Sequence, residues 1–132
     1  MITRAALAGL CLLLATLGLS ISASASPADV NAQAFYLDAR DLLAKGMRAM
    51  FDKRMKPMMA QMKDAGETVR AENLALTAKG TPLYCVPDAA RKKGMSAQAV
   101  VDKLGAIPQA QRERMTLKQA WRTILVREYS CR

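Results

Sequence analysis

Tyr84-Cys85-Val86-Pro87 and Tyr129-Ser130-Cys131 decide the fold, because they hold the two cysteines that frame about the last third of the chain. In a small exported protein such a pair is most simply a structural disulfide, whereas in the cytosol it indicates a metal site or redox chemistry. A bond between Cys85 and Cys131 closes a loop of about 47 residues, which the chain-entropy model values at about 4 kcal/mol. We therefore predict one intramolecular disulfide, provided that the protein is exported.

Residues 1–25 have the layout of a secretory signal peptide. One charged residue, Arg4, precedes a long apolar run, and a stretch of small residues follows it. The best small-x-small site is Ala23-Ser24-Ala25, so we expect cleavage between Ala25 and Ser26 and a periplasmic product. An uncleaved membrane anchor is disfavoured, because the apolar run of about 15 residues is shorter than the roughly 20 that cross a bilayer. Cleavage also removes Cys11, which leaves an even number of cysteines.

The remaining residues, 26–132, have the size of one compact domain. The whole chain carries 20 basic and 11 acidic side chains, and this excess of positive charge favours acidic partners. Export and the scarcity of aromatic residues argue against nucleic acid as that partner. The sequence contains no histidine and no recognisable phosphate-binding or catalytic motif, so we expect neither an enzyme nor a bound cofactor or metal.

Strong helix formers fill the segments between glycines and prolines, and no strand pattern is visible. We predict an all-α fold: a small single-domain helical bundle of about four to five helices. Asp29 is the expected N-cap of the first helix, and Asp64-Ala65-Gly66 is the expected bend before a helix over 67–79. Ser96 and the Thr116 capping box open the last two long helices.

A methionine-rich segment follows Gly46, with apolar residues at steps of three and four that predict one helical face. Its members are Met47, Met50, Phe51, Met55, Met58, Met59 and Met62. The spacing favours a stripe that faces the core or forms the seam of a homodimer. An adaptable binding surface is the second interpretation. Copper(I) binding is a third and weaker one, because no histidine or cysteine accompanies the methionines.

A cluster of basic residues, Arg91, Lys92 and Lys93, precedes Gly94. We expect a basic loop there. A solvated turn is the favoured interpretation of this loop, and a contact site for a partner is the alternative.

The C-terminal half resembles the Tai-type family of type VI secretion immunity proteins. The resemblance covers about residues 66–132 and rests on Gly80-Thr81-Pro82-Leu83-Tyr84-Cys85-Val86-Pro87, the helix that Ser96 opens, Pro108, and the final Tyr129-Ser130-Cys131. The family usually has proline where this chain has Ser130. The resemblance implies a small exported helical protein whose Cys85 and Cys131 are bonded, and which neutralises a peptidoglycan-cleaving amidase by blocking its active site.

These features predict an exported, non-enzymatic periplasmic protein that binds and occludes a secreted peptidoglycan-degrading effector. They predict no nucleic acid and no stable insertion into a membrane. The alternative is a small envelope-stress chaperone or structural factor that uses the methionine-rich face to hold its clients.

Overall fold

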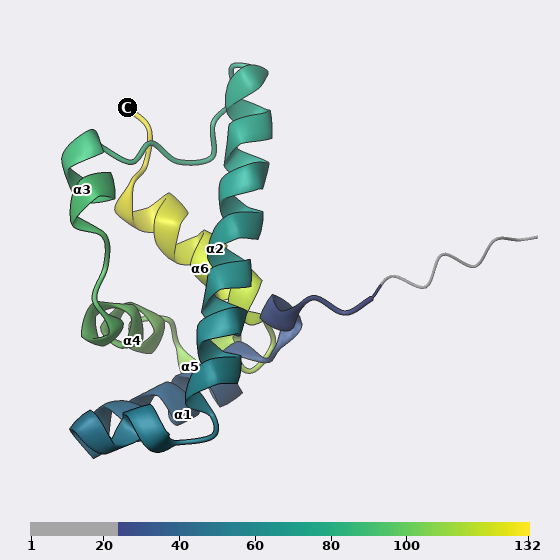
Figure 1. The fold of residues 1–132 in the computed structure, drawn as a ribbon. Coiled ribbons are helices and arrows are strands. Elements are labelled where there is room, and N and C mark those ends of the chain that lie inside the picture. The colour runs from purple at the N-terminus through teal and green to yellow at the C-terminus, as the bar shows by residue number, and fades with distance from the viewer. Residues whose placement is uncertain (1–23) are drawn as a thin grey trace, which may run out of the picture.

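The computed structural model describes residues 24–132 (Figure 1), so the predicted signal peptide lies outside the described residues except for its last two. The described part forms six α-helices, two 3-10 helices and no strand. The helices are η1 (Pro27–Asp29), α1 (Ala32–Lys45), η2 (Gly46–Phe51), α2 (Met55–Ala78), α3 (Asp88–Lys93), α4 (Ala97–Gly105), α5 (Gln109–Arg112) and α6 (Leu117–Glu128). The all-α prediction is confirmed. The helices outnumber the expected four or five because the short α3 and α5 occupy connecting segments.

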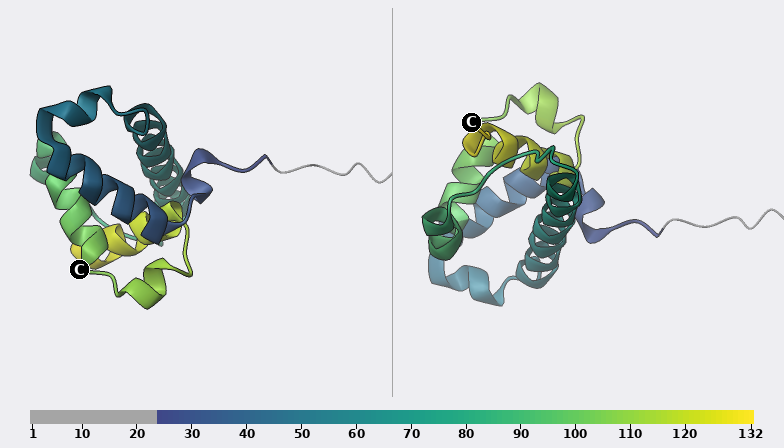
Figure 2. Two further views of the ribbon diagram at one scale, coloured as in Figure 1. Left: turned by 90° about the horizontal axis from the view of Figure 1, so that it is seen from below. Right: turned by 90° about the horizontal axis from the view of Figure 1, so that it is seen from above.

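Helix α6 lies at the centre of the molecule and contacts α1, α2, α4 and η1. The 24-residue helix α2 runs along one side, with α3 and α4 on the opposite side (Figures 1 and 2). The capping box predicted at Thr116 is present: its hydroxyl accepts the Gln119 amide N–H at 3.2 Å, and the Gln119 side chain accepts the Thr116 amide N–H at 2.8 Å. None of the described helices is long and apolar enough to cross a membrane.

The core consists of two clusters that α6 joins. The larger cluster contains Phe35, Leu104, Ile107, Leu117 and Ile124, together with several fully buried alanines. A smaller cluster of Val69, Tyr84 and Leu125 lies toward the C-terminal end of α6. Because alanines fill so many buried positions, the helices can approach closely, and little bulky side-chain volume holds them together.

The N-terminus of α1 differs from the expectation, because Asn31 and not Asp29 is its N-cap. The Asn31 side chain accepts the amide N–H groups of Gln33 and Ala34, at 2.9 and 3.1 Å. Asp29 instead ends η1, and its carboxylate accepts the Ser26 amide at 2.8 Å. A short antiparallel bridge between Asn31 and Thr116 joins the start of α1 to the start of α6. Tertiary pairing therefore moved the helix start by two residues.

The predicted bend at Asp64-Ala65-Gly66 is wrong, because α2 continues through it without interruption. Ala65 is fully buried, and the Asp64 carboxylate accepts hydrogen bonds from the Ala28 amide, at 2.9 Å, and from the Ser26 hydroxyl. A glycine inside a helix costs about 1 kcal/mol relative to alanine. The packing of α2 on η1 and α6 outweighs that cost.

The predicted disulfide between Cys85 and Cys131 is present, with the two Cα atoms 5.0 Å apart. The segment before it is extended and is held against α2 by one side chain. The Asn73 amide oxygen accepts the Leu83 and Tyr84 amides, at 2.8 and 3.2 Å, and its nitrogen donates to the Tyr84 carbonyl at 3.1 Å. The Cys85 amide donates to the carbonyl of Tyr129 at 2.7 Å. These contacts fix the C-terminal end of the chain on α2.

A buried arginine locks α5 onto α1 and α4. Arg112 is 6% exposed and stacks over the ring of Tyr36, 4.2 Å from its centroid. Its guanidinium donates to the carbonyls of Leu104, at 3.1 Å, and Ile107, and to the Gln33 side chain at 2.7 Å. The charge is therefore dispersed over neutral acceptors and an aromatic face.

Candidate functional site

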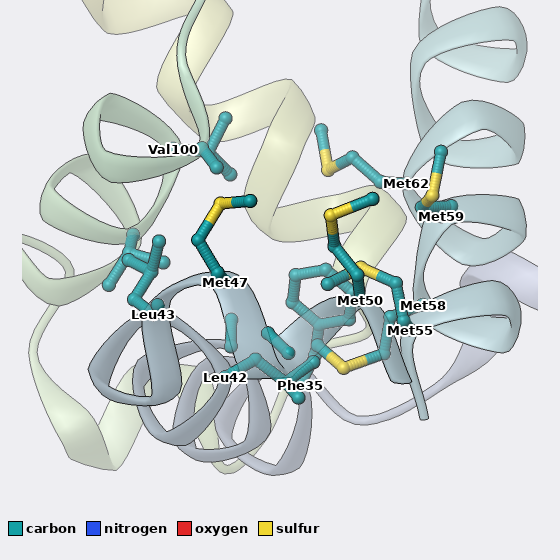
Figure 3. A pocket seen from close by; sticks show the side chains of 15 residues that line it. Phe35, Leu42, Leu43, Met47, Met50, Met55, Met58, Met59, Met62 and Val100 are labelled. Atoms are coloured by element: carbon teal, nitrogen blue, oxygen red, sulfur yellow. The ribbon is translucent and has the colours of Figure 1, made fainter. Parts of the chain in front are cut away.

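An apolar groove of about 480 Å³ lies between α1, η2, the first turns of α2, and α4 (Figure 3). Six of the nine methionines of the chain line it, together with Phe35, Leu42, Leu43 and Val100. These methionines are Met47, Met50, Met55, Met58, Met59 and Met62. The volume is in the range of pockets that hold ligands, about 300–1,000 Å³. The groove is the candidate functional site.

The backbone around Gly46 and Asp52 builds the groove by turning the chain back on itself. Gly46 has a φ of +56°, a conformation that side-chain-bearing residues rarely adopt, and it ends α1. The 3-10 helix η2 follows, and the Asp52 carboxylate then accepts the Arg54 amide at 2.9 Å, which starts α2. The methionine-rich segment is thus divided between two arms that face each other across the groove.

The prediction of a single core-facing methionine stripe is therefore confirmed only in part, because Met58 belongs to the larger core cluster and Met55 and Met62 pack against it. Only Met58 is buried, at 8% exposure, and it forms the floor of the groove. Met47, Met50, Phe51 and Met59 are 80%, 68%, 91% and 66% exposed, respectively. One face cannot hold all of these residues, because the turn at Asp52 breaks the helical repeat. The arrangement supports the second interpretation, an adaptable apolar surface.

Arg54 ties the two arms to α1 through a cluster of ionic contacts. It pairs with Asp38 at 2.8 Å, with Asp52 at 3.0 Å and with Asp41, while Lys45 pairs with Asp52 at 2.7 Å. Hydrogen bonds from Arg54 and then from Lys45 hold the pKa of Asp52 well below its ordinary value of 3.8. Asp52 is thus ionised at neutral pH, and the turn that shapes the groove stays locked.

Soft ligands are plentiful in the groove, but they do not converge. The thioether sulfurs are spread along its walls rather than gathered around one point (Figure 3). No group of three or more histidine, cysteine, aspartate or glutamate side chains in residues 24–132 is placed to hold a metal ion. The arrangement suits dispersion contacts with apolar side chains better than coordination.

A second, shallower hollow of about 390 Å³ adjoins the groove, and Met62 and Val100 line both. It continues along α2 as far as Arg70 and also touches Trp121 of α6. The two hollows together follow α2 from Met55 to Arg70, about 22 Å at 1.5 Å per residue. Trp121 is partly buried and packs against both core clusters.

The other site residues predicted from the sequence lie outside the groove. Arg91, Lys92 and Lys93 are exposed, and they form the last turn of α3 rather than the expected loop. Arg91 is engaged locally, 3.5 Å from the Asp88 carboxylate. Cys85 and Cys131 lie near the C-terminus, at the end of the molecule opposite α1 and η2 (Figure 1).

The predicted cleavage site, Ala25–Ser26, lies where packing begins. Ala25 is exposed, whereas Ser26 caps η1 and bonds to Asp64. Cleavage at this bond stays a prediction.

Comparison of the chain with protein-family models, with curated proteins and with solved structures finds no match. The resemblance to immunity proteins therefore rests on the motifs of the sequence alone.

Proposed function

We propose that this protein is an exported, non-enzymatic binding protein that occludes a secreted peptidoglycan-degrading effector in the periplasm. The observation that carries the binding role is the open groove with its exposed methionines. Clustered apolar side chains on the surface of a small protein mark an interaction site. Methionine side chains repack readily against a partner, which suits a surface that must fit a toxin closely.

Two further features support the immunity role. The bond between Cys85 and Cys131 is the one that the resemblance implies, and disulfides persist in oxidising compartments such as the periplasm. Because the charge cluster around Arg54 and the buried Arg112 are occupied in holding helices together, neither is free to act on a substrate. Inhibition by steric occlusion needs only a rigid body and a complementary surface.

Survival of cells that export a candidate effector tests this proposal. The cells carry an effector encoded beside this gene, together with the wild-type protein or the groove variant Met50→Glu/Met59→Glu. Both methionines are exposed, so the substitutions place charge in the groove without burying it. The control is Leu74→Glu, at a residue of α2 that is 58% exposed and lines neither hollow.

We expect the wild type and Leu74→Glu to protect the cells and the groove variant to fail. Protection by all three proteins would show that the groove is not the binding face. Failure of the wild type against every effector encoded nearby would reject the immunity role.

The exposed methionines also favour a second candidate, an envelope chaperone that holds unfolded clients. It predicts that the purified protein suppresses the aggregation of several unrelated proteins, and that Met50→Ser/Met59→Ser removes this activity. Tight binding to one partner, with no effect on unrelated clients, would reject this candidate.

A further inference from the structure

The rim of the groove is positively charged. Residues 46–63, which form η2 and the first turns of α2, contain five basic side chains and one acidic one. Arg48, Lys53 and Lys56 are exposed, and none of them pairs with a carboxylate within residues 24–132. Arg48 follows the groove residue Met47, and Lys56 follows Met55, so each of these charges lies roughly 100–120° around its helix from a groove residue, on the flank of that arm.

The acidic residues near the rim all pair with basic side chains, including Glu67 of the second hollow, whose carboxylate lies 3.7 Å from Lys63. Asp38, Asp41 and Asp52 all contact Arg54, and Lys45 contacts two of them. This cluster of three carboxylates and two cations has a net charge of −1, and Arg48, Lys53 and Lys56 add three positive charges, so the surface beside the groove is cationic overall. A partner that seats in the groove and neutralises this charge must bring carboxylates to its edges.

The charge pattern disfavours a second copy of this chain as the occupant. In a symmetric dimer the same patch faces itself, so Arg48, Lys53 and Lys56 of both copies would lie close together. The homodimer expected from the methionine spacing therefore meets repulsion at this face.

The shape of the surface favours a helix of a partner protein over a bilayer. The two hollows form an elongated concave track of about 22 Å along α2, which matches a helix of four turns. Met58 lies at the floor of this track, where the flat surface of a membrane does not reach but an inserted side chain does. Its walls are helices with no free strand edge among the described residues, so docking by strand addition is not available.

We infer that the groove receives an amphipathic helix of the partner protein, with aliphatic side chains at i, i+3, i+4 and i+7 directed into the methionines and carboxylates flanking them over Arg48, Lys53 and Lys56. This inference rests on the proposed function only in that the groove is the face that binds protein. It adds the chemistry of the occupant.

Two synthetic helical peptides of about 16 residues test the inference, a length that spans the track. Both carry the same leucine face, and their flanks carry either glutamates or lysines. Binding to the purified full-length gene product is followed through the ¹³C-labelled methyl groups of the methionines. Met115 is the internal control, because it packs against the core and does not line the groove.

We expect the glutamate peptide to shift the methyl resonances of the groove methionines and to leave Met115 unchanged. It should bind at least about tenfold more tightly than the lysine peptide, because rim charges set selectivity. That advantage should shrink as salt rises from about 0.05 to about 0.5 M, since salt screens exposed charges.

Charge reversal separates the rim from the net charge of the protein. The variant Arg48→Glu/Lys53→Glu/Lys56→Glu should prefer the lysine peptide. The control reverses three exposed cations elsewhere that make no ion pair among the described residues: Lys79→Glu/Arg114→Glu/Arg132→Glu. It has the same net charge and should keep the original preference.

Several results would overturn the inference. Equal binding of the two peptides would show that the rim charges select nothing. Shifts produced by phosphatidylglycerol vesicles but by neither peptide would identify a membrane-binding face, and shifts that depend on protein concentration alone would identify a second copy. If neither peptide binds while Met50→Glu/Met59→Glu still abolishes protection of cells, the chemistry of the occupant is wrong and the proposed function stands.

Discussion

Removal of the disulfide should cost a large share of the stability of this protein, through its effect on the unfolded chain. Cys85 and Cys131 are 46 positions apart, and the chain-entropy model gives about 4 kcal/mol for closing such a loop. Both cysteines are exposed, so replacing them leaves no cavity and adds little packing loss. A loss of about 4 kcal/mol is a large share of the 5–15 kcal/mol typical of a domain, and corresponds to a fall in Tm of roughly 15–30 °C.

Urea unfolding of Cys85→Ser/Cys131→Ser, followed by far-UV circular dichroism, measures this loss. The slope of unfolding free energy against urea should rise slightly, because the unfolded chain without the bond exposes more surface. The wild type in reductant should match the double variant, and the double variant should not respond to reductant. A loss below about 1 kcal/mol would refute the reasoning, because residual contacts would then already restrain the unfolded chain.

Three further perturbations probe the contacts that hold the helices. Arg112→Met should lower the free energy of unfolding by about 2–4 kcal/mol in thermal melts, because the buried carbonyl of Ile107 loses its donor and that of Leu104 keeps only the Ile107 amide. Asn73→Ala should cost about 1–3 kcal/mol and speed hydrogen exchange at the amides of Leu83 and Tyr84, whereas Asn73→Asp should lose only the donated bond. Acid should destabilise the fold. The lowered pKa of Asp52 contributes to the free energy of unfolding, and this contribution is complete above about pH 4 and is lost as the pH falls toward the folded pKa. In urea melts Asp52→Asn should therefore lose less stability on acidification than the wild type.

The sequence predicts those features of the fold that depend on contacts between residues three or four positions apart. The Thr116 capping box and the Ser96 N-cap both appear where expected. In each case the group that satisfies the orphan amide or carbonyl lies in the same turn of chain. The cysteine pairing was predictable for a different reason, since residues 26–132 contain only two cysteines.

The predictions fail where residues that are distant in the sequence determine the local structure. Asn31 replaced Asp29 as N-cap because the start of α1 pairs with the start of α6, 85 positions away in the chain. α2 passes through Gly66 because η1 and α6 bury its neighbour Ala65. The sequence gives no indication that Arg112 is buried, since nothing in a short polar turn distinguishes a buried guanidinium from an exposed one.

The sequence predicts which methionines form an apolar surface but not how they are arranged around the groove. The three- and four-residue spacing of the methionines predicts one helical face, whereas the structure divides them between two arms. The glycine at position 46 and the Asp52-Lys53-Arg54 turn were the signals that the chain reverses, because an aspartate that accepts the amide two residues later starts a new element. The spacing of the methionines does not predict that the two arms face each other, since this arrangement depends on the contacts of Arg54 with α1.

The first and the later turns of α2 have different roles, and this explains how a small protein can expose so much apolar surface. Its first turns supply Met55, Met58 and Met59 to the groove, whereas its later turns supply Val69 and Asn73 to the cluster beside the disulfide. The cross-link lies at the end of the molecule away from the groove (Figure 1). Met58 belongs to the core, but Met47, Met50 and Met59 are exposed, so these three side chains can rearrange around a partner without loosening the fold.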